Sequence, residues 1–212
     1  MSVYMTEDEQ LESIKKWWKR YGNMVVVCLS FLLLSVAGYR YLHWHQEKMT
    51  QQASTTYENM MMEFSNDNTK AVRAYANELI KNYSSSVYAD VAHMTLAKLY
   101  ISKDKLVKAK EELQLVVDNS NIKTLKQIAR IRVARILAAE KSFTNAFKEL
   151  SSVDDSVYLP VINELKGDLY GSTKQYQEAI NSYHLATDEV KSKGIANLFL
   201  EMKTNELATK NG

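Results

Sequence analysis

Residues 165–186, LKGDLYGSTKQYQEAINSYHLA, show the pattern that decides the fold of this chain. Gly167 and Tyr170 are followed, after a polar turn, by Ala179 and Tyr183. A small residue in one helix lets a second helix approach closely, an alanine fits at the crossing, and large residues fill the groove between the two. The stretch therefore predicts two short helices that pack closely against each other.

Two earlier stretches repeat this spacing. Ala109, Ala146 and Ala179 are the alanines expected at the helix crossings, and they are 37 and then 33 residues apart. This period is close to the roughly 34 residues of tetratricopeptide repeats. The other matching positions are Leu96, Ala97, Tyr100, Leu113 and Val116 in the first copy, and Val133, Ala134, Leu137, Leu150 and Val153 in the second.

The pattern extends in weaker form toward both ends of the repeat region. A degenerate unit is predicted from a helix at 51–64, a polar turn at 65–69 and a helix at 70–82, and a capping helix is predicted at 195–209. With one Pro and six Gly among 212 residues, few helix breakers interrupt the chain. The fold class is therefore predicted as all-α, with an N-terminal transmembrane helix followed by a tetratricopeptide-like α-solenoid.

The transmembrane helix is predicted from an apolar run near the N-terminus. Residues 24–39 carry no charge. A helix over 21–42 would be about 33 Å long, which matches the roughly 30 Å of membrane hydrocarbon. Aromatic side chains, which favour the headgroup level of a membrane, flank both ends. These predicted interface residues are Trp17, Trp18 and Tyr21 before the run, and Tyr39, Tyr41 and Trp44 after it.

A cleavable signal peptide is the alternative for this run. Ser35 and Ala37, just before Gly38, form the small-x-small pattern that signal peptidase accepts. Two features favour retention. The polar segment before the run is long and acidic, and the second aromatic group would serve no purpose if the run were removed. We therefore expect the helix to stay as an anchor.

The charges beside the run predict its orientation. Arg40 and Lys48 follow it, whereas four cations precede it, and positive residues favour the cytoplasmic side of a membrane. These four topology residues are Lys15, Lys16, Lys19 and Arg20. The expected location is the inner membrane of a two-membrane bacterium, as a single-pass type II protein. The predicted domains are a cytoplasmic amphipathic segment at 1–20, the transmembrane helix at 21–42 and a periplasmic tetratricopeptide-like repeat domain at 43–212.

The segment before the run also carries a helix pattern. Thr6 and Glu9 form a capping box, and Leu11, Ile14 and Trp18 recur at helical spacing. One interpretation is a short amphipathic helix that lies on the inner leaflet. The alternative is a frayed tail whose cations only set the topology.

Three segments together resemble a known family. They are EDEQLESIKKWWKRYG at 7–22, KNYSSSVYADVAHMTLAKLY at 81–100 and LKGDLYGSTKQYQEAINSYHLA at 165–186. In combination with one apolar span, they make the chain resemble the YfgM family, the ancillary subunits of the bacterial SecYEG translocon in the inner membrane. The likeness covers essentially the whole chain. Its departures are Ser84 and Asn121, which stand where prolines often close a repeat unit and so affect the register of the repeats.

The resemblance implies partners and supplies no catalytic residues. It implies a periplasmic domain that pairs with a PpiD-like membrane-anchored chaperone. It also implies that this domain receives unfolded secretory clients as they emerge from the SecYEG translocon. A link to stress signalling through RcsB comes with the same family.

The sequence contains no pattern typical of an enzyme. It has no G-x-S-x-G, no H-E-x-x-H and no glycine loop for phosphate. The four histidines are scattered, so no metal site or cofactor is predicted. The single cysteine, Cys28, lies in the apolar run and cannot form an internal disulfide. A formal net charge of +2 gives no global field for nucleic acid. We therefore predict a protein that is not an enzyme and has no small-molecule substrate or nucleic-acid partner.

One surface of the repeats is a candidate partner-binding groove. If the repeats begin at Asp90, Gln127 and Pro160, positions 2, 5, 9 and 12 of each first helix point into it. Such a groove mixes apolar and cationic side chains at one end, turns acidic at the other, and suits an extended or helical peptide. The groove candidates are Val91, Met94, Lys98, Ile101, Ile128, Ile131, Arg135, Glu164 and Asp168. A basic row, open to interpretation as a solvated rim or as an edge of this groove, is formed by Lys123, Lys126, Arg130, Arg132 and Arg135.

These observations favour one function and leave others open. The leading hypothesis is a membrane-tethered interaction module at the translocon that helps hand translocated proteins to periplasmic chaperones. A scaffold for envelope assembly, unrelated to secretion, would use the same architecture. A stress-response regulator would have to act through residues 1–20, and an envelope hydrolase would need a site that forms only in the fold.

Overall fold

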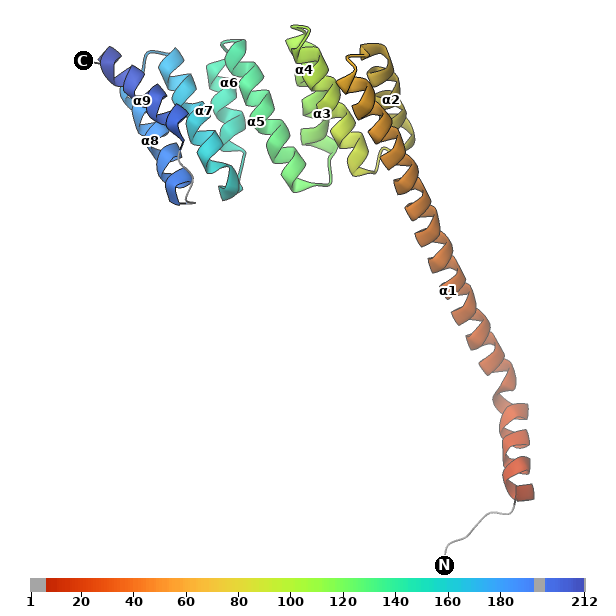
Figure 1. Cartoon of the computed structure of the whole chain (residues 1–212). Coiled ribbons are helices and arrows are strands. Elements are labelled where there is room, and N and C mark those ends of the chain that lie inside the picture. The colour runs from red at the N-terminus through yellow and green to blue at the C-terminus, as the bar shows by residue number, and fades with distance from the viewer. Residues whose placement is uncertain (1–6, 193–196, 212) are drawn as a thin grey trace, which may run out of the picture. The chain divides into compact units, whose positions relative to one another are not determined.

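The computed structural model describes residues 7–192 and 197–211, and these residues form helices and turns without a β-strand. The chain divides into two compact units, Met1–Gln52 and Ala53–Gly212, whose elements are drawn in Figure 1. The predicted all-α fold class is confirmed. Each unit is described by itself below.

The N-terminal unit consists of most of helix α1, which spans Glu7–Ser65. Its apolar side chains point outward, and Phe31 and Leu34 are 73% and 72% exposed. Over Ile14–Ser65 it is the one helix, among the residues described, that is long and apolar enough to cross a membrane. A signal sequence near the N-terminus has the same properties, so the 21–42 span stays a prediction.

The ends of the apolar run carry the expected ring pairs. The ring centroids of Trp17 and Tyr21 are 5.9 Å apart at one end, and those of Tyr41 and Trp44 are 6.3 Å apart at the other. Residues 7–20 are helical, although the predicted capping box of Thr6 and Glu9 lies outside the described side chains. Amphipathic rings grouped at two levels of one helix are what an interfacial anchor requires.

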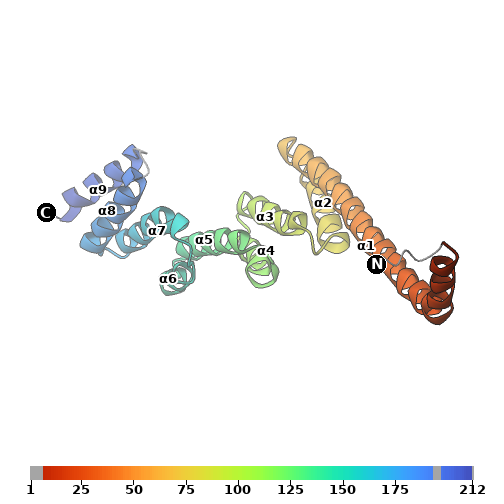
Figure 2. The ribbon, with the colours of Figure 1, turned by 90° about the horizontal axis from the view of Figure 1, so that it is seen from below.

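The C-terminal unit is built from helix pairs that follow one another (Figure 2). The end of α1 packs with α2, and the pairs α3–α4, α5–α6 and α7–α8 follow, before α9 packs on α8. A short 3₁₀ turn, η1, precedes α7. The bounds are α2 Thr69–Asn82, α3 Val87–Ile101, α4 Leu106–Asn119, α5 Lys123–Ala139, α6 Phe143–Ser151, η1 Ser156–Tyr158, α7 Leu159–Ser172, α8 Tyr176–Ser192 and α9 Leu198–Asn211.

Two predicted boundaries differ from the structure. The first helix of the degenerate unit does not begin at residue 51, because α1 continues to Ser65 without a break. Residues 43–52 contain neither Gly nor Pro, so nothing in the sequence stops the helix there. The capping helix spans Leu198–Asn211 rather than 195–209, and residues 195 and 196 lie outside the described residues.

The turn inside each helix pair has the same geometry. One residue in each takes a positive φ angle, and the backbone then closes the first helix with a Schellman motif. In the second pair the N–H of Lys105 donates to the carbonyl of Tyr100 at 2.9 Å, and the N–H of Asp104 donates to that of Ile101 at 3.0 Å. The positive-φ residues, 37, 37 and 33 residues apart, are Asp67 (55°), Asp104 (55°), Lys141 (59°) and Lys174 (62°).

Small residues at the crossings hold the pairs together. Ala109, Ala146 and Ala179 are fully buried, as the repeat pattern requires. The equivalent position in the degenerate unit is Val72, which lies five residues after Asp67 as Ala109 lies five after Asp104, and it is 1% exposed. Since this position holds no alanine, the sequence pattern did not identify it. The repeat region is therefore four helix pairs of one design, closed by α9.

Candidate interaction groove

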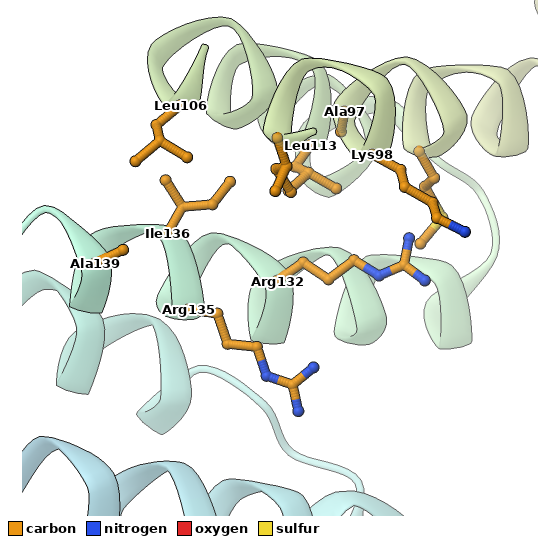
Figure 3. A pocket seen from close by; sticks show the side chains of 10 residues that line it. Ala97, Lys98, Leu106, Leu113, Arg132, Arg135, Ile136 and Ala139 are labelled. Carbon is orange, nitrogen blue, oxygen red and sulfur yellow. The ribbon is translucent and has the colours of Figure 1, made fainter. Parts of the chain in front are cut away.

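A groove opens between α3, α4 and α5, with a cavity volume of about 440 Å³ (Figure 3). This size lies within the usual range for binding pockets, roughly 300–1,000 Å³. The residues that line it are Met94, Ala97, Lys98 and Ile101 from α3, Leu106 and Leu113 from α4, and Arg132, Arg135, Ile136 and Ala139 from α5.

The floor of the groove is apolar because it belongs to the core of the repeats. Leu113 is fully buried, and Met94 and Ile136 are 7% and 4% exposed. Ala97 and Ala139 carry only a methyl group, so the space between α3 and α5 stays open above this floor. Ile101 is 44% exposed, which gives the groove an apolar edge that a partner can cover.

The polar part of the groove is entirely cationic. The side chains of Lys98 and Arg132 extend to the same end of the groove, and Arg135 lies one turn of α5 from Arg132 (Figure 3). Lys98 Nζ lies 5.0 Å from the ring centroid of Phe64, which adds a cation–π contact. Partial burial, and then the charge of Arg135, lower the pKa of Arg132. The residues that line the groove include no carboxylate.

The structure brings four of the predicted groove residues together: Met94, Lys98, Ile101 and Arg135. The other candidates lie elsewhere. Val91 and Ile128 are half-buried, and Ile131 is buried in the core at 5% exposure. Glu164 and Asp168 lie on α7, where they contact α9.

Sequence reasoning missed Arg132, Ile136 and Ala139 as groove residues. It assigned positions 2, 5, 9 and 12 to every first helix alike. In the structure one groove lies between two first helices, and each of them lines it with a different set of positions. Counted from the predicted starts, α3 contributes positions 5, 8, 9 and 12, and α5 contributes 6, 9, 10 and 13. The signal for Arg132 was its place in the basic row.

The predicted acidic end of the groove is occupied by α9. Lys203 Nζ lies 2.7 Å from Asp168 Oδ1 and 3.0 Å from Glu164 Oε1, and the hydroxyl of Tyr183 donates to Asp168 at 2.7 Å. Burial, and then the bond to Asp168, raise the pKa of Tyr183. Burial alone would lower the pKa of Lys203, but its hydrogen bonds to Asp168 and Glu164 outweigh that effect and raise it.

One histidine of the repeats makes a structural contact with a carboxylate. His93 Nδ1 lies 2.7 Å from Glu112 Oε2, which joins α3 to α4. Across the described ranges, 7–192 and 197–211, no three His, Cys, Asp or Glu side chains are grouped so that they could hold a metal ion. The groove is therefore the site with the clearest capacity for recognition.

Comparisons with known proteins agree with this architecture. A relative from Aggregatibacter actinomycetemcomitans is 26% identical over 188 residues, which cover 89% of this chain and 92% of the relative. Relatives from Neisseria gonorrhoeae and Escherichia coli K12 are each 23% identical over 208 residues, which cover 98% of this chain and all of the relative. All three are named "Ancillary SecYEG translocon subunit".

These relatives confirm the resemblance expected from the N-terminal block and the repeats. The likeness extends over nearly the whole length, so it includes the apolar part of α1 as well as the helix pairs. A model of the tetratricopeptide repeat-like domain matches residues 15–209. The chain therefore belongs to the tetratricopeptide repeat-like domain family.

Proposed function

We propose that this chain is a membrane-tethered interaction module that associates with the SecYEG translocon. The observation that carries the proposal is the near end-to-end similarity to proteins named as ancillary subunits of that translocon. Repeat folds of stacked helix pairs act mainly by binding other polypeptides along their grooves. The apolar-floored groove between α3, α4 and α5 gives this chain such a surface.

The proposed topology places the groove outside the cytoplasm. Helix α1 spans the inner membrane over residues 21–42, the four cations at 15–20 stay on the cytoplasmic side, and residues 43–212 lie in the periplasm. The exposed apolar side chains of α1 and the cations before them support this arrangement. Protease digestion of spheroplasts tests it, because a periplasmic repeat domain is cut there, whereas a cytoplasmic one is protected.

Tethering supplies the mechanism. A domain held near the exit of a pore meets emerging chains at an effective concentration of the order of mM. A weak groove is then sufficient, and weak binding lets a client pass on to a PpiD-like chaperone. No bond is made or broken in this scheme, so the proposed role is that of a non-enzymatic adaptor for unfolded secretory clients.

Photocrosslinking in inner membranes tests the proposed function. A photoreactive amino acid at Ile101, on the exposed edge of the groove, should capture secretory chains and chaperone or translocon subunits. The same group at Leu185, which is 57% exposed on α8, provides a control outside the groove. Capture of envelope-assembly proteins instead, with no translocon subunit, would contradict the proposal and favour the scaffold alternative.

A further inference from the structure

We propose that the groove between α3, α4 and α5 binds an acidic amphipathic polypeptide segment. One large apolar side chain of the segment enters between Leu113 and Ile136, and its carboxylates contact Lys98, Arg132 and Arg135. This inference rests on the proposed function, because it names the chemistry of the partner that the same groove would take.

The cations that line the groove lack the carboxylate partners that two other basic residues of α5 have. Two basic residues of this helix that do not line the groove have carboxylate partners within the chain. Lys123 Nζ lies 3.0 Å from Asp154, and Arg130 lies 3.6 Å from Glu149. Within the described residues, no carboxylate forms an ion pair with Lys98, Arg132 or Arg135. The three cations that line the cavity therefore have no carboxylate partner among the described residues, and Lys126, which does not line it, donates to the backbone carbonyl of Asp118.

The other end of the repeats shows how such a position is neutralised. Lys98 and Asp168 both occupy position 9, counted from Asp90 and Pro160. After α7, the next helix that stands in the place of a first helix is α9. Its Lys203 Nζ lies 2.7 Å from Asp168 Oδ1, so the two opposite charges form an ion pair. After α3, the next first helix is α5. Its Arg132 lines the same cavity as Lys98, so two like charges face one space. Like charges in a partly desolvated site repel, and an external carboxylate relieves this repulsion.

The floor sets the second requirement on the partner. Leu113 and Ile136 are buried beneath the open space, and Ile101 leaves an apolar edge. Met94 adds an unbranched thioether that adapts to different apolar side chains. A purely acidic segment would leave the apolar floor in contact with water. A purely apolar segment would cover three cations without giving them a carboxylate partner, which costs free energy. A segment with both features covers the apolar floor and pairs with the cations, much as amphipathic helices bind in apolar grooves.

Peptide binding to the full chain tests the inference. The chain is placed in nanodiscs of zwitterionic lipid that contain no translocon. Three fluorescein-labelled peptides of equal length carry the same Leu and Phe positions, flanked by Glu, Gln or Lys. By fluorescence anisotropy, the Glu peptide should bind about tenfold more tightly than the Gln peptide, because each charge-assisted contact adds to the affinity. The Lys peptide should bind more weakly than either.

Charge reversal supplies the matched variants. Arg132→Glu should weaken the Glu peptide about tenfold and strengthen the Lys peptide. Lys148→Glu, on the exposed side of α6, changes the net charge equally and should leave both affinities unchanged. If circular dichroism shows that Arg132→Glu fails to fold, Lys98→Gln at the exposed rim is the test variant instead. It should lower the affinity for the Glu peptide several-fold.

Two results would overturn the inference. One is equal binding of the three peptides, and the other is equal loss in Arg132→Glu and Lys148→Glu. Since no translocon is present, such a result would leave the proposed function standing if groove crosslinks in membranes persist. Conversely, charge selectivity together with absent translocon crosslinks would refute the proposed function and keep this inference.

Discussion

Lys203 Nζ, on the closing helix α9, lies 2.7 Å from Asp168 Oδ1 on α7, although the two residues are 35 positions apart. The contact fixes α9 against α7, and Leu200, which is fully buried on α9, supplies the apolar part of the same junction. A helix of 14 residues is marginal alone in water. The end of the repeat array therefore depends on this junction.

Replacing Lys203 should weaken the junction. In Lys203→Ala, the half-buried carboxylates of Asp168 and Glu164 lose their shared cation, so we expect the free energy of unfolding to fall by about 1–2 kcal/mol. Thermal and urea unfolding of the full chain in mild detergent, followed by circular dichroism, measures this. Amide hydrogen exchange should also rise first in α9.

An exposed ion pair between α8 and α9 gives the control for that variant. Lys191 lies 3.4 Å from Glu201, with the two side chains 57% and 46% exposed. Exposed pairs contribute little, so Lys191→Ala should cost at most about 0.5 kcal/mol. An equal loss in the two variants would mean that the charge at Lys203 has no special role.

The same cluster predicts a loss of stability at high pH. The pKa values of Tyr183 and Lys203 are both raised in the folded state. The folded chain then holds these protons more tightly than the unfolded chain, so their contribution is complete below about pH 10 and declines as the pH rises further. Unfolding curves at pH 8 to 11 measure the decline. Tyr183→Phe should flatten it, and parallel curves for the two proteins would contradict the assignment.

The repeats were predictable from sequence because their cause is local. The three clear units each carry an alanine at the helix crossing, and Ala109, Ala146 and Ala179 reveal the period without any structure. The degenerate unit was less visible, since α1 enters it with no breaker before Ser65. Local composition gives the existence of a helix more reliably than its first residue.

The groove was only partly predictable because it depends on rotation between neighbouring helices. Periodicity along α3 identifies Met94, Lys98 and Ile101, but the side of α5 that faces them follows from packing across a turn and a second helix. The role of Lys203 is similar, because its partners lie on α7 and no local pattern joins them. Contacts between units therefore needed the structure.

Gly167 is a position where only glycine fits. A Cβ atom there would overlap the ring of Tyr183, which is held by its bond to Asp168. We expect Gly167→Ala to lower the free energy of unfolding by about 1–3 kcal/mol, as overpacking does. Gly171→Ala in the same helix is the matched control, since its nearest neighbour would be Leu207 at 3.6 Å. That change should be neutral or stabilise by up to about 1 kcal/mol, and the reverse order would refute the packing argument.

The left-handed turn residues predict a stabilising change. Lys174 has a φ of 62° between α7 and α8, a conformation that costs a residue with a Cβ about 1–2 kcal/mol. Lys174→Gly removes this cost but gains freedom in the unfolded chain, so a net stabilisation of about 0.5–1 kcal/mol is expected. Lys174→Val removes the same charge and places a β-branched residue at positive φ, so it should destabilise. Urea unfolding of the two variants separates the effect of backbone strain from that of charge. If the free energy of unfolding changes in the same direction for both, loss of the lysine charge controls stability and the turn does not.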